Sequence, residues 1–226
     1  MILEVCANSY ESAINAEKGG AHRIELCENL AVGGITPNFE LSKKVISELN
    51  IPVFILIRPR DGDFYYSHEE FQQIKKDIII FKDLGCKGIV SGVLTKEKNL
   101  DKYRTKELIE LSRPLEFTFH RAFDEVNNPK VALNQLVELK ADRILTSGQK
   151  KTAIEGIEMI KKLVILSKKK IKIMPGSGIN SANIIEFNKV DINEIHGSFS
   201  KQEKNNKSIS NINIIMNCVK LISDCK

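Results

Sequence analysis

The chain alternates between short apolar runs rich in β-branched residues and longer stretches in which apolar residues recur every three or four positions. The first pattern predicts buried β-strands, and the second predicts amphipathic helices. Eight runs have the length and composition of strands, and a helical stretch follows each of them. These eight runs are 3–7, 23–27, 53–58, 88–93, 116–120, 143–147, 172–175 and 194–197.

Residues typical of helix ends flank several of the helical stretches. Ser67 and Glu70 match the capping-box pattern, in which a hydroxyl and a carboxylate satisfy free amides at a helix start. Gly85 can adopt the left-handed conformation that ends many helices, so we expect one helix between these positions. Thr36 followed by Pro37 predicts another helix start, because proline is well tolerated in the first turn.

The alternation predicts an α/β protein with a parallel sheet, because a helix between two strands acts as a crossover connection. Eight such units match a (β/α)8 TIM barrel, for which 226 residues is a short but sufficient length. An open, doubly wound sheet is the alternative. The barrel is favoured because no glycine-rich nucleotide fingerprint follows the first strand and because polar residues recur at strand ends.

Domain organisation is simple, since no linker divides the chain and residues 1–226 are predicted to form a single domain. The polar stretch 201–211 lacks apolar periodicity and is expected to be an irregular loop, followed by a final helix over 212–226. The chain opens directly on a strand and has no apolar segment long enough for a membrane helix, so we expect no membrane partner.

The formal net charge of +5 comes from lysines spread along the chain, with one run at 168–170. That run closes a helical stretch, where lysines commonly face solvent. No nucleic-acid-binding motif accompanies it, so nucleic acid is not expected as a partner. Five cysteines without a tight spacing pattern indicate reduced thiols and a cytoplasmic location.

Ionisable residues gather at the carboxyl ends of the predicted strands. Alternate residues of a strand share a face, so Glu4 shares one with Cys6, and Glu25 shares one with Cys27. Their apolar neighbours should pack on the helices, which directs these four side chains into the barrel. Functional residues of TIM barrels lie at this end, so the pattern predicts either a catalytic site or structural ion pairs. The predicted mouth site contains Glu4, Glu25, Arg58, His120, Arg121 and Asp124.

Two glycine-containing turns predict an anion site. The segment PGSGIN follows the seventh strand, and HGS ends the eighth. Glycines let backbone amides approach a ligand, and a helix expected to start near Ser181 would add its positive end. TIM barrels often bind phosphate between these two loops, although the same glycines also suit ordinary turns. The predicted anion-binding residues are Gly176, Ser177, Gly178, Gly197 and Ser198.

A series of longer motifs resembles one known family. The segments GAHRIELCENLAVGGITPN, RPRDGDFYYS, TFHRAFD, LTSGQ and EIHGS occur in the order seen in the CutC family, and the resemblance covers about 3–198. It implies a TIM barrel, a cytoplasmic homo-oligomer (a dimer or tetramer) and a role in copper homeostasis. By resemblance, the copper(I) ligands are Cys6 and Cys27, and the mouth residues carry over to the positions named above. After Ser198 the chain departs from the family's motifs.

Two functions therefore remain open. Copper(I) prefers soft thiolate ligands, and a register that pairs Glu4 with Glu25 would place the two thiols about one strand spacing (~4.8 Å) apart. Arg58 or Arg121 nearby would then favour the thiolates. The alternative is an enzyme acting on a small phosphorylated or carboxylated metabolite, with His120 and one glutamate as the acid–base pair and the arginines holding the anion.

Overall fold

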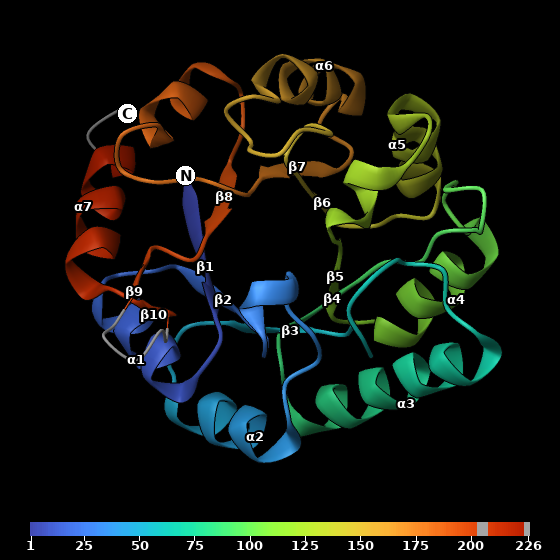
Figure 1. Cartoon of the computed structure of the whole chain (residues 1–226), viewed down its shortest axis with the longest axis horizontal. Coiled ribbons are helices and arrows are strands. Elements are labelled where there is room, and N and C mark those ends of the chain that lie inside the picture. The colour runs from blue at the N-terminus through green and yellow to red at the C-terminus, as the bar shows by residue number, and fades with distance from the viewer. Residues whose placement is uncertain (203–207, 224–226) are drawn as a thin grey trace.

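A ring of parallel strands surrounded by helices forms the core of the molecule (Figure 1). The computed structural model describes residues 1–202 and 208–223. The eight-stranded sheet has the order β7-β6-β5-β4-β3-β2-β1-β8, and β7 and β8 lie side by side where the ring closes. The strands are β1 (Ile2–Ala7), β2 (Arg23–Leu26), β3 (Val53–Leu56), β4 (Gly88–Ser91), β5 (Glu116–Phe119), β6 (Arg143–Thr146), β7 (Lys172–Pro175) and β8 (Glu194–Gly197).

The predicted TIM barrel is thus confirmed, and each predicted strand forms within two residues of its expected bounds. Each pair in the ladder is parallel, which follows from the crossover connections. The connecting α-helices are α1 (Tyr10–Lys18), α2 (Phe39–Glu48), α3 (His68–Leu84), α4 (Lys102–Ser112), α5 (Pro129–Glu138), α6 (Ile157–Ser167) and α7 (Ile212–Ser223). Short 3-10 helices are η1 (Leu30–Val32), η2 (Arg121–Glu125) and η3 (Ile184–Lys189).

Helix ends mostly follow the local sequence. Ser67 and Glu70 form both bonds of the capping box at α3, and Gly85 ends that helix with φ of 97°. The expected start of α2 at Thr36 is wrong. Asn38 caps this helix instead, because its side chain accepts a hydrogen bond from the Leu41 amide.

The connection between β7 and β8 differs from the prediction of an amphipathic α-helix. A turn leads into the six-residue η3 instead of a helix starting near Ser181. Side chains of Asn180 and Asn183 bond to backbone groups of this turn, which competes with regular helical hydrogen bonds. The connection therefore brings no α-helix N-terminus to the carboxyl end of the barrel.

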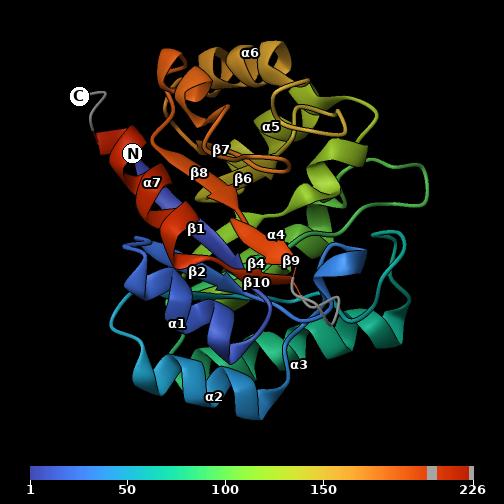
Figure 2. The same cartoon turned by 60° about the vertical axis from the view of Figure 1, so that its left-hand side comes forward.

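The polar stretch 201–211 is not wholly irregular, as the sequence had indicated. Strands β9 (Ser200–Gln202) and β10 (Ser208–Ser210) pair antiparallel, and the part of the stretch between them lies outside the described residues. Serine hydroxyls tie the pair together, since Ser208 donates to Ser200 at 2.7 Å. The hairpin lies against α1 (Figure 2), where Asn15 donates to the carbonyl of Ser210. The final helix, α7, is described as far as Ser223.

Apolar side chains form a large core between the strands and the helices, and a second, smaller cluster inside the barrel. Leu3, Val5 and Ala7 belong to the outer core, while Glu4 and Cys6 alternate with them and face inward. The inner apolar cluster comprises Cys6, Cys27, Phe54, Leu56 and Val90, with Leu30 packed against it. Polar side chains fill the remaining interior. In the described part of the chain, no helix is both long and apolar enough to cross a membrane.

Candidate functional site

The register of β1 and β2 differs from the one expected. Glu4 pairs with Arg23, and Cys6 pairs with Glu25, so β2 is displaced by two residues relative to the predicted pairing. Barrel closure requires strands to be staggered, and this stagger moves Glu4 below Glu25. The thiols nevertheless meet diagonally, with 3.6 Å between the Sγ atoms of Cys6 and Cys27.

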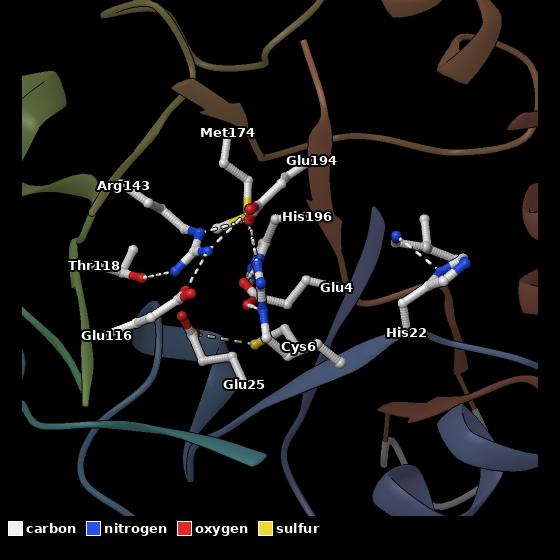
Figure 3. A network of polar contacts seen from close by, with 12 residues as sticks. Glu4, Cys6, His22, Glu25, Glu116, Thr118, Arg143, Met174, Glu194 and His196 are labelled. Carbon is white, nitrogen blue, oxygen red and sulfur yellow. Dashed lines mark hydrogen bonds and ion pairs between the residues drawn. The ribbon is translucent and has the colours of Figure 1, made fainter. Parts of the chain in front are cut away.

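Charged side chains fill the lower part of the barrel interior. We call Glu4, Arg23, Arg143 and Glu194 the ion cluster, and all four are at most 5% exposed. Glu194 accepts from Arg23 and from Arg143, each at 2.5 Å, and Arg23 also pairs with Glu4. Figure 3 shows Arg143 between Glu194, Glu116 and Thr118.

Opposite charges compensate one another in the ion cluster. Burial alone would raise the pKa of Glu4, but Arg23 and His196 beside it lower this pKa to about 2. Burial likewise opposes ionisation of Glu194, yet its bonds with Arg143 bring that pKa to about 2. Glu4 is therefore an ionised partner of Arg23 beneath the mouth of the barrel, and not part of the cavity wall in which the sequence placed it.

Directly above the ion cluster lie Cys6, Cys27, Glu25 and His196, which we call the thiol cluster. Cys6 Sγ is 3.7 Å from Glu25 Oε1, and one potential ligand atom from each of Cys6, Glu25 and His196 lies within 4.8 Å of the others. All four residues are buried. Soft sulfur and imidazole nitrogen beside a carboxylate form a donor set suited to a transition metal.

His196 is the member of the thiol cluster that sequence analysis missed. In the sequence it belongs to the HGS segment that ends the eighth strand, where only the glycine and the serine are predicted to bind a ligand. Alternation along β8 places it on the same inward face as Glu194, and its Nδ1 lies 2.8 Å from Oε1 of Glu4. The period-two argument that directed Glu4 and Cys6 inward applies equally to Glu194 and His196, so the signal was present in the sequence.

Local electrostatics raise the pKa of Cys6, Glu25 and His196 and so favour their protonated forms. The hydrogen bond with Cys27, burial and the charge of Glu25 raise the pKa of Cys6 well above its ordinary value. Burial raises the pKa of Glu25 to about 7, and Oε2 of this carboxyl has no hydrogen-bond partner among the described residues. Burial lowers the pKa of His196, but the carboxylates of Glu25 and Glu4 outweigh it and the net shift is upward. The expectation that nearby arginines hold Cys6 as a thiolate is therefore wrong.

A cavity of about 620 Å³ opens above the thiol cluster at the carboxyl end of the barrel. This mouth cavity has the size of a small-molecule site, since such pockets span roughly 300–1,000 Å³. Glu4, Cys27 and Gly176 do not line it, whereas the other predicted site residues do. Those that line it are Cys6, Glu25, Arg58, His120, Arg121, Asp124, Ser177, Gly178, Gly197 and Ser198.

Arg58 joins two loops at the cavity wall. Its guanidinium donates to the carbonyls of Val32, Gly34 and Gly62 at 2.8–2.9 Å, so it fastens the segment after β2 to the segment after β3. The side chain is buried, and no carboxylate lies within salt-bridge distance of it in the described part of the chain. Its positive charge at the cavity wall is thus left without a directly paired anion.

His120 is buried in the same wall as a neutral imidazole. Burial and the charge of Arg58 lower its pKa to about 3. Its Nδ1 accepts from the Ala122 amide, which assigns the proton to Nε2. Within the described residues, Nε2 has no hydrogen-bond partner. A group with so low a pKa is a weak general base, so His120 acts more readily as a hydrogen-bond donor.

Asp124 organises the loop after β6. It accepts hydrogen bonds from the Thr146 hydroxyl, from the backbone and hydroxyl of Ser147, and from the Gln149 amide. Arg121 donates to the same carboxylate at 2.9 Å, and its other nitrogen bonds Ser147. The segments TFHRAFD and LTSGQ are therefore joined through one carboxylate, which fixes Arg121 at the rim of the cavity.

The predicted anion site is only partly assembled. Ser177, Gly178, Gly197 and Ser198 lie in the cavity wall, but Gly176 is committed elsewhere, because its amide donates to the Thr146 carbonyl. The hydroxyl of Ser177 donates to the carbonyl of Lys151. Since η3 replaces the expected helix, a helix dipole adds nothing here, and anion binding by these turns stays a prediction.

Comparison with known proteins gives a clear relationship. The family model described as the CutC family matches residues 1–201, which extends the resemblance noted over about 3–198. The chain belongs to the CutC family. A human relative, "Copper homeostasis protein cutC homolog", is 47% identical over 183 residues, which is 81% of this chain and 67% of the relative.

Bacterial members of the CutC family agree in sequence and structure. A CutC family protein of Histophilus somni is 44% identical over 197 residues, covering 87% of this chain and 81% of its own length. The solved structure of CutC from Streptococcus agalactiae superimposes with a TM-score of 0.83 at 32% identity, covering 88% of this chain and 98% of that one. The barrel described above is thus the fold of a solved CutC structure.

Proposed function

We propose that the thiol cluster binds copper(I), with Cys6 and Cys27 as its sulfur ligands and His196 as a nitrogen ligand. The observation that carries this proposal is the 3.6 Å separation of two buried Sγ atoms, one of which, Sγ of Cys6, lies within 4.8 Å of a ring nitrogen of His196. Copper(I) is a soft ion that favours thiolate and imidazole donors, so the residues suit it. The names of the curated relatives, which describe copper homeostasis proteins, support the same conclusion.

Binding at this cluster requires loss of thiol protons. Because the pKa of Cys6 is raised, a metal ion must compete with a tightly held proton. The carboxyl of Glu25, whose Oε2 is unpaired among the described residues, adjoins Cys6 and can take up a proton that the metal displaces. Copper(I) affinity should therefore rise with pH over the neutral range. Mutual repulsion between two thiolates is relieved once a cation lies between them.

A competition titration tests the proposal. Copper(I) is titrated into the protein against a chromogenic chelator for wild type, Cys6→Ser and Cys27→Ser. Each ligand variant should lose about a hundredfold or more in affinity, since even second-shell changes at metal sites cost about 10–100-fold. Cys86→Ser and Cys218→Ser are matched controls, because these buried thiols lie outside the barrel interior. Unchanged affinity in both ligand variants would exclude the cluster as the copper site.

A second candidate is the enzyme of the sequence analysis, acting on a small anionic metabolite in the mouth cavity. The cavity favours it, because about 620 Å³ is far more space than one metal ion needs. The acid–base assignment changes, however. Glu25, with a pKa of about 7, is suited to proton transfer near neutral pH, whereas His120 is suited to hydrogen bonding. Substrate turnover lost in Glu25→Gln and kept in wild type would support this candidate.

Cellular location and assembly complete the proposal. A cytoplasmic location is supported by the four described cysteines, Cys6, Cys27, Cys86 and Cys218, all of which are free thiols. Homo-oligomerisation rests on the family resemblance and stays a prediction. Sedimentation of the purified protein across a range of concentrations tests it, and a species with the 25.5 kDa mass of the chain at all concentrations would contradict it.

A further inference from the structure

Three features of the mouth cavity are not explained by metal binding at the thiols. The first is its charge. Arg58 and Arg121 lie in the wall, and among the described residues the ion pair of Asp124 is with Arg121. Asp61 and Glu125 also line the cavity, but both are exposed at its edge, and Glu125 pairs with Lys98. Among the described residues of the inner wall, the buried Arg58 is therefore a cation without an ion-pair partner, whereas Glu25, which also lines the cavity, has a pKa raised to about 7 and is neutral when protonated.

The second feature is the unpartnered nitrogen of His120. The residue is 4% exposed, and its Nε2 has no hydrogen-bond partner among the described residues. An unmet buried donor costs about 1–3 kcal/mol, so such groups in native proteins usually have a partner such as a bound water or a ligand. Phe64 packs against this imidazole, with 4.8 Å between ring centroids, and lines the same cavity.

The third feature is the apolar part of the wall. Five aliphatic side chains, contributed by the loops after β2 and β7 and by β3 and β6, line the cavity. They are Leu30, Val32, Leu56, Leu145 and Ile179. A free inorganic ion would leave this surface unused. A molecule with an apolar body and a charged group at one end would contact it.

We propose that the mouth cavity binds a small organic carboxylate, whose charged end lies near Arg58 and Arg121 and accepts a hydrogen bond from Nε2 of His120. A carboxylate carries one negative charge, which would balance the unpaired Arg58, and it has an acceptor oxygen for Nε2 of His120. A phosphate dianion would exceed that charge. The inference deepens the second candidate function, on which it rests, by naming its ligand class, and it does not require copper.

Calorimetric titration with defined probes tests this. Hexanoate, benzoate and cyclohexanecarboxylate are each compared with the corresponding uncharged amide, and inorganic phosphate is the fourth anion. At least one carboxylate should bind, with its amide about tenfold weaker or worse, because a charge-assisted hydrogen bond is lost. His120→Phe and Arg121→Met should each weaken that carboxylate by about tenfold, while His68→Asn, at an exposed histidine, should not.

Nuclear magnetic resonance adds a direct readout. In the complex, the Nε2 proton of His120, assigned by its loss in His120→Phe, should shift downfield as it gains an acceptor. An unshifted proton, equal binding of acid and amide, or unchanged affinity in both variants would overturn the proposal. So would the absence of carboxylate binding up to about 10 mM, which is weaker than specific recognition requires. Phosphate binding that survives both variants would place the anion at the glycine turns instead.

The two functions fail separately in this design. Cys27→Ser should bind the carboxylate as wild type does, since Cys27 does not line the cavity, and His120→Phe should keep the copper(I) affinity. A carboxylate that binds without being converted would remove the enzyme candidate while leaving the binding site established. Carboxylate affinity that falls in Cys27→Ser but not in His120→Phe would place the ligand on the thiols and contradict the proposal.

Discussion

Two neighbouring regions of the barrel interior use the same strands in opposite ways. In the ion cluster, each of Glu4, Arg23, Arg143 and Glu194 has an oppositely charged partner. One step higher, the thiol cluster and the mouth cavity contain a carboxyl oxygen, Glu25 Oε2, and an imidazole nitrogen, His120 Nε2, without partners in the described chain. The charges of the ion cluster are paired within the protein. The thiol cluster and the mouth cavity instead contain hydrogen-bonding atoms that are available to a ligand.

The two regions differ in how they contribute to the free energy of folding. A compensated buried network is strongly coupled, so removal of one member leaves another charge alone. Unpartnered groups oppose folding, and proteins retain such groups mainly where they are needed for binding or catalysis. We therefore expect substitutions in the ion cluster to destabilise the protein, and substitutions in the thiol cluster and the cavity wall to change binding with little loss of stability.

The largest effect should come from Arg143→Met in the ion cluster. This change leaves Glu194 with fewer donors in a buried position, and removal of one partner of a buried ion pair costs about 3–5 kcal/mol. Urea unfolding measures the free energy. Lys102→Met, which breaks an exposed pair with Glu138, is the control and should change stability by about 0–1 kcal/mol. An equal decrease of the unfolding free energy in the two variants would show that the buried ion cluster stabilises the fold no more than an exposed ion pair does.

The next effect is a pH dependence that Glu25 introduces. Its pKa is about 7 in the folded protein against an ordinary value of 4.5, so the folded state binds the proton more tightly than the unfolded state. Below pH 4.5 the group contributes nothing. As pH rises from 4.5 to about 7, stability falls, and above 7 the full cost of an ionised buried carboxyl, about 3 kcal/mol, is present.

Glu25→Gln should remove most of this fall. Unfolding free energies measured between pH 5 and pH 8 should decline for wild type and remain flatter for the variant, which should be the more stable protein at pH 8. His196 contributes a smaller decline in the same direction, because its pKa is raised and its favourable charge is lost at high pH. Parallel curves for the two proteins would show that Glu25 is already ionised at low pH.

The ion cluster should show the opposite pH dependence in a different range. The pKa values of Glu4 and Glu194 are about 2, against 4.5 ordinarily, so their stabilisation is present above pH 4.5 and is lost as pH falls toward 2. Unfolding measured between pH 5 and pH 2 should therefore lose stability steeply. Glu4→Gln should flatten this acid limb and leave the decline between pH 5 and 8 in place, whereas an unchanged acid limb would contradict the assignment.

The smallest effect on stability is expected at the thiols. Cys6→Ser keeps a hydroxyl beside Glu25 and removes only the larger sulfur, so it should change the unfolding free energy by about 1 kcal/mol. The same variant should lose copper(I) affinity strongly, which makes it the reverse of Arg143→Met. A loss of stability as large as that of Arg143→Met would place Cys6 among the structural residues.

Much of this architecture could be predicted from local sequence. Alternation along single strands directed Glu4, Cys6, Glu25 and Cys27 into the barrel, and all of them are buried. The register could not be predicted, because the stagger of β1 against β2 is set by closure of the whole ring. The error had a consequence, since it placed Glu4 level with Glu25 instead of beside Arg23.

The ion-pair partners inside the barrel could not be predicted from local sequence either. Arg23 and Arg143 each open a strand, a position that usually faces solvent, and only the long-range approach of β8 shows that Glu194 neutralises both. Arg58 also fastens two loops through carbonyl groups, and this structural role carries no sequence signature. The positions of the strands could thus be predicted from the sequence. The partner of each charged side chain could not, because it depends on which strands lie next to each other in the barrel.

The paired thiols Cys6 and Cys27 are the centre of the proposed metal site. X-ray absorption at the copper K-edge, recorded on protein loaded with one equivalent of copper(I), tests this most directly. We predict two sulfur scatterers and one nitrogen from His196 in the first shell, with one sulfur lost in Cys27→Ser. A first shell of nitrogen and oxygen alone, identical in wild type and Cys27→Ser, would contradict the central claim.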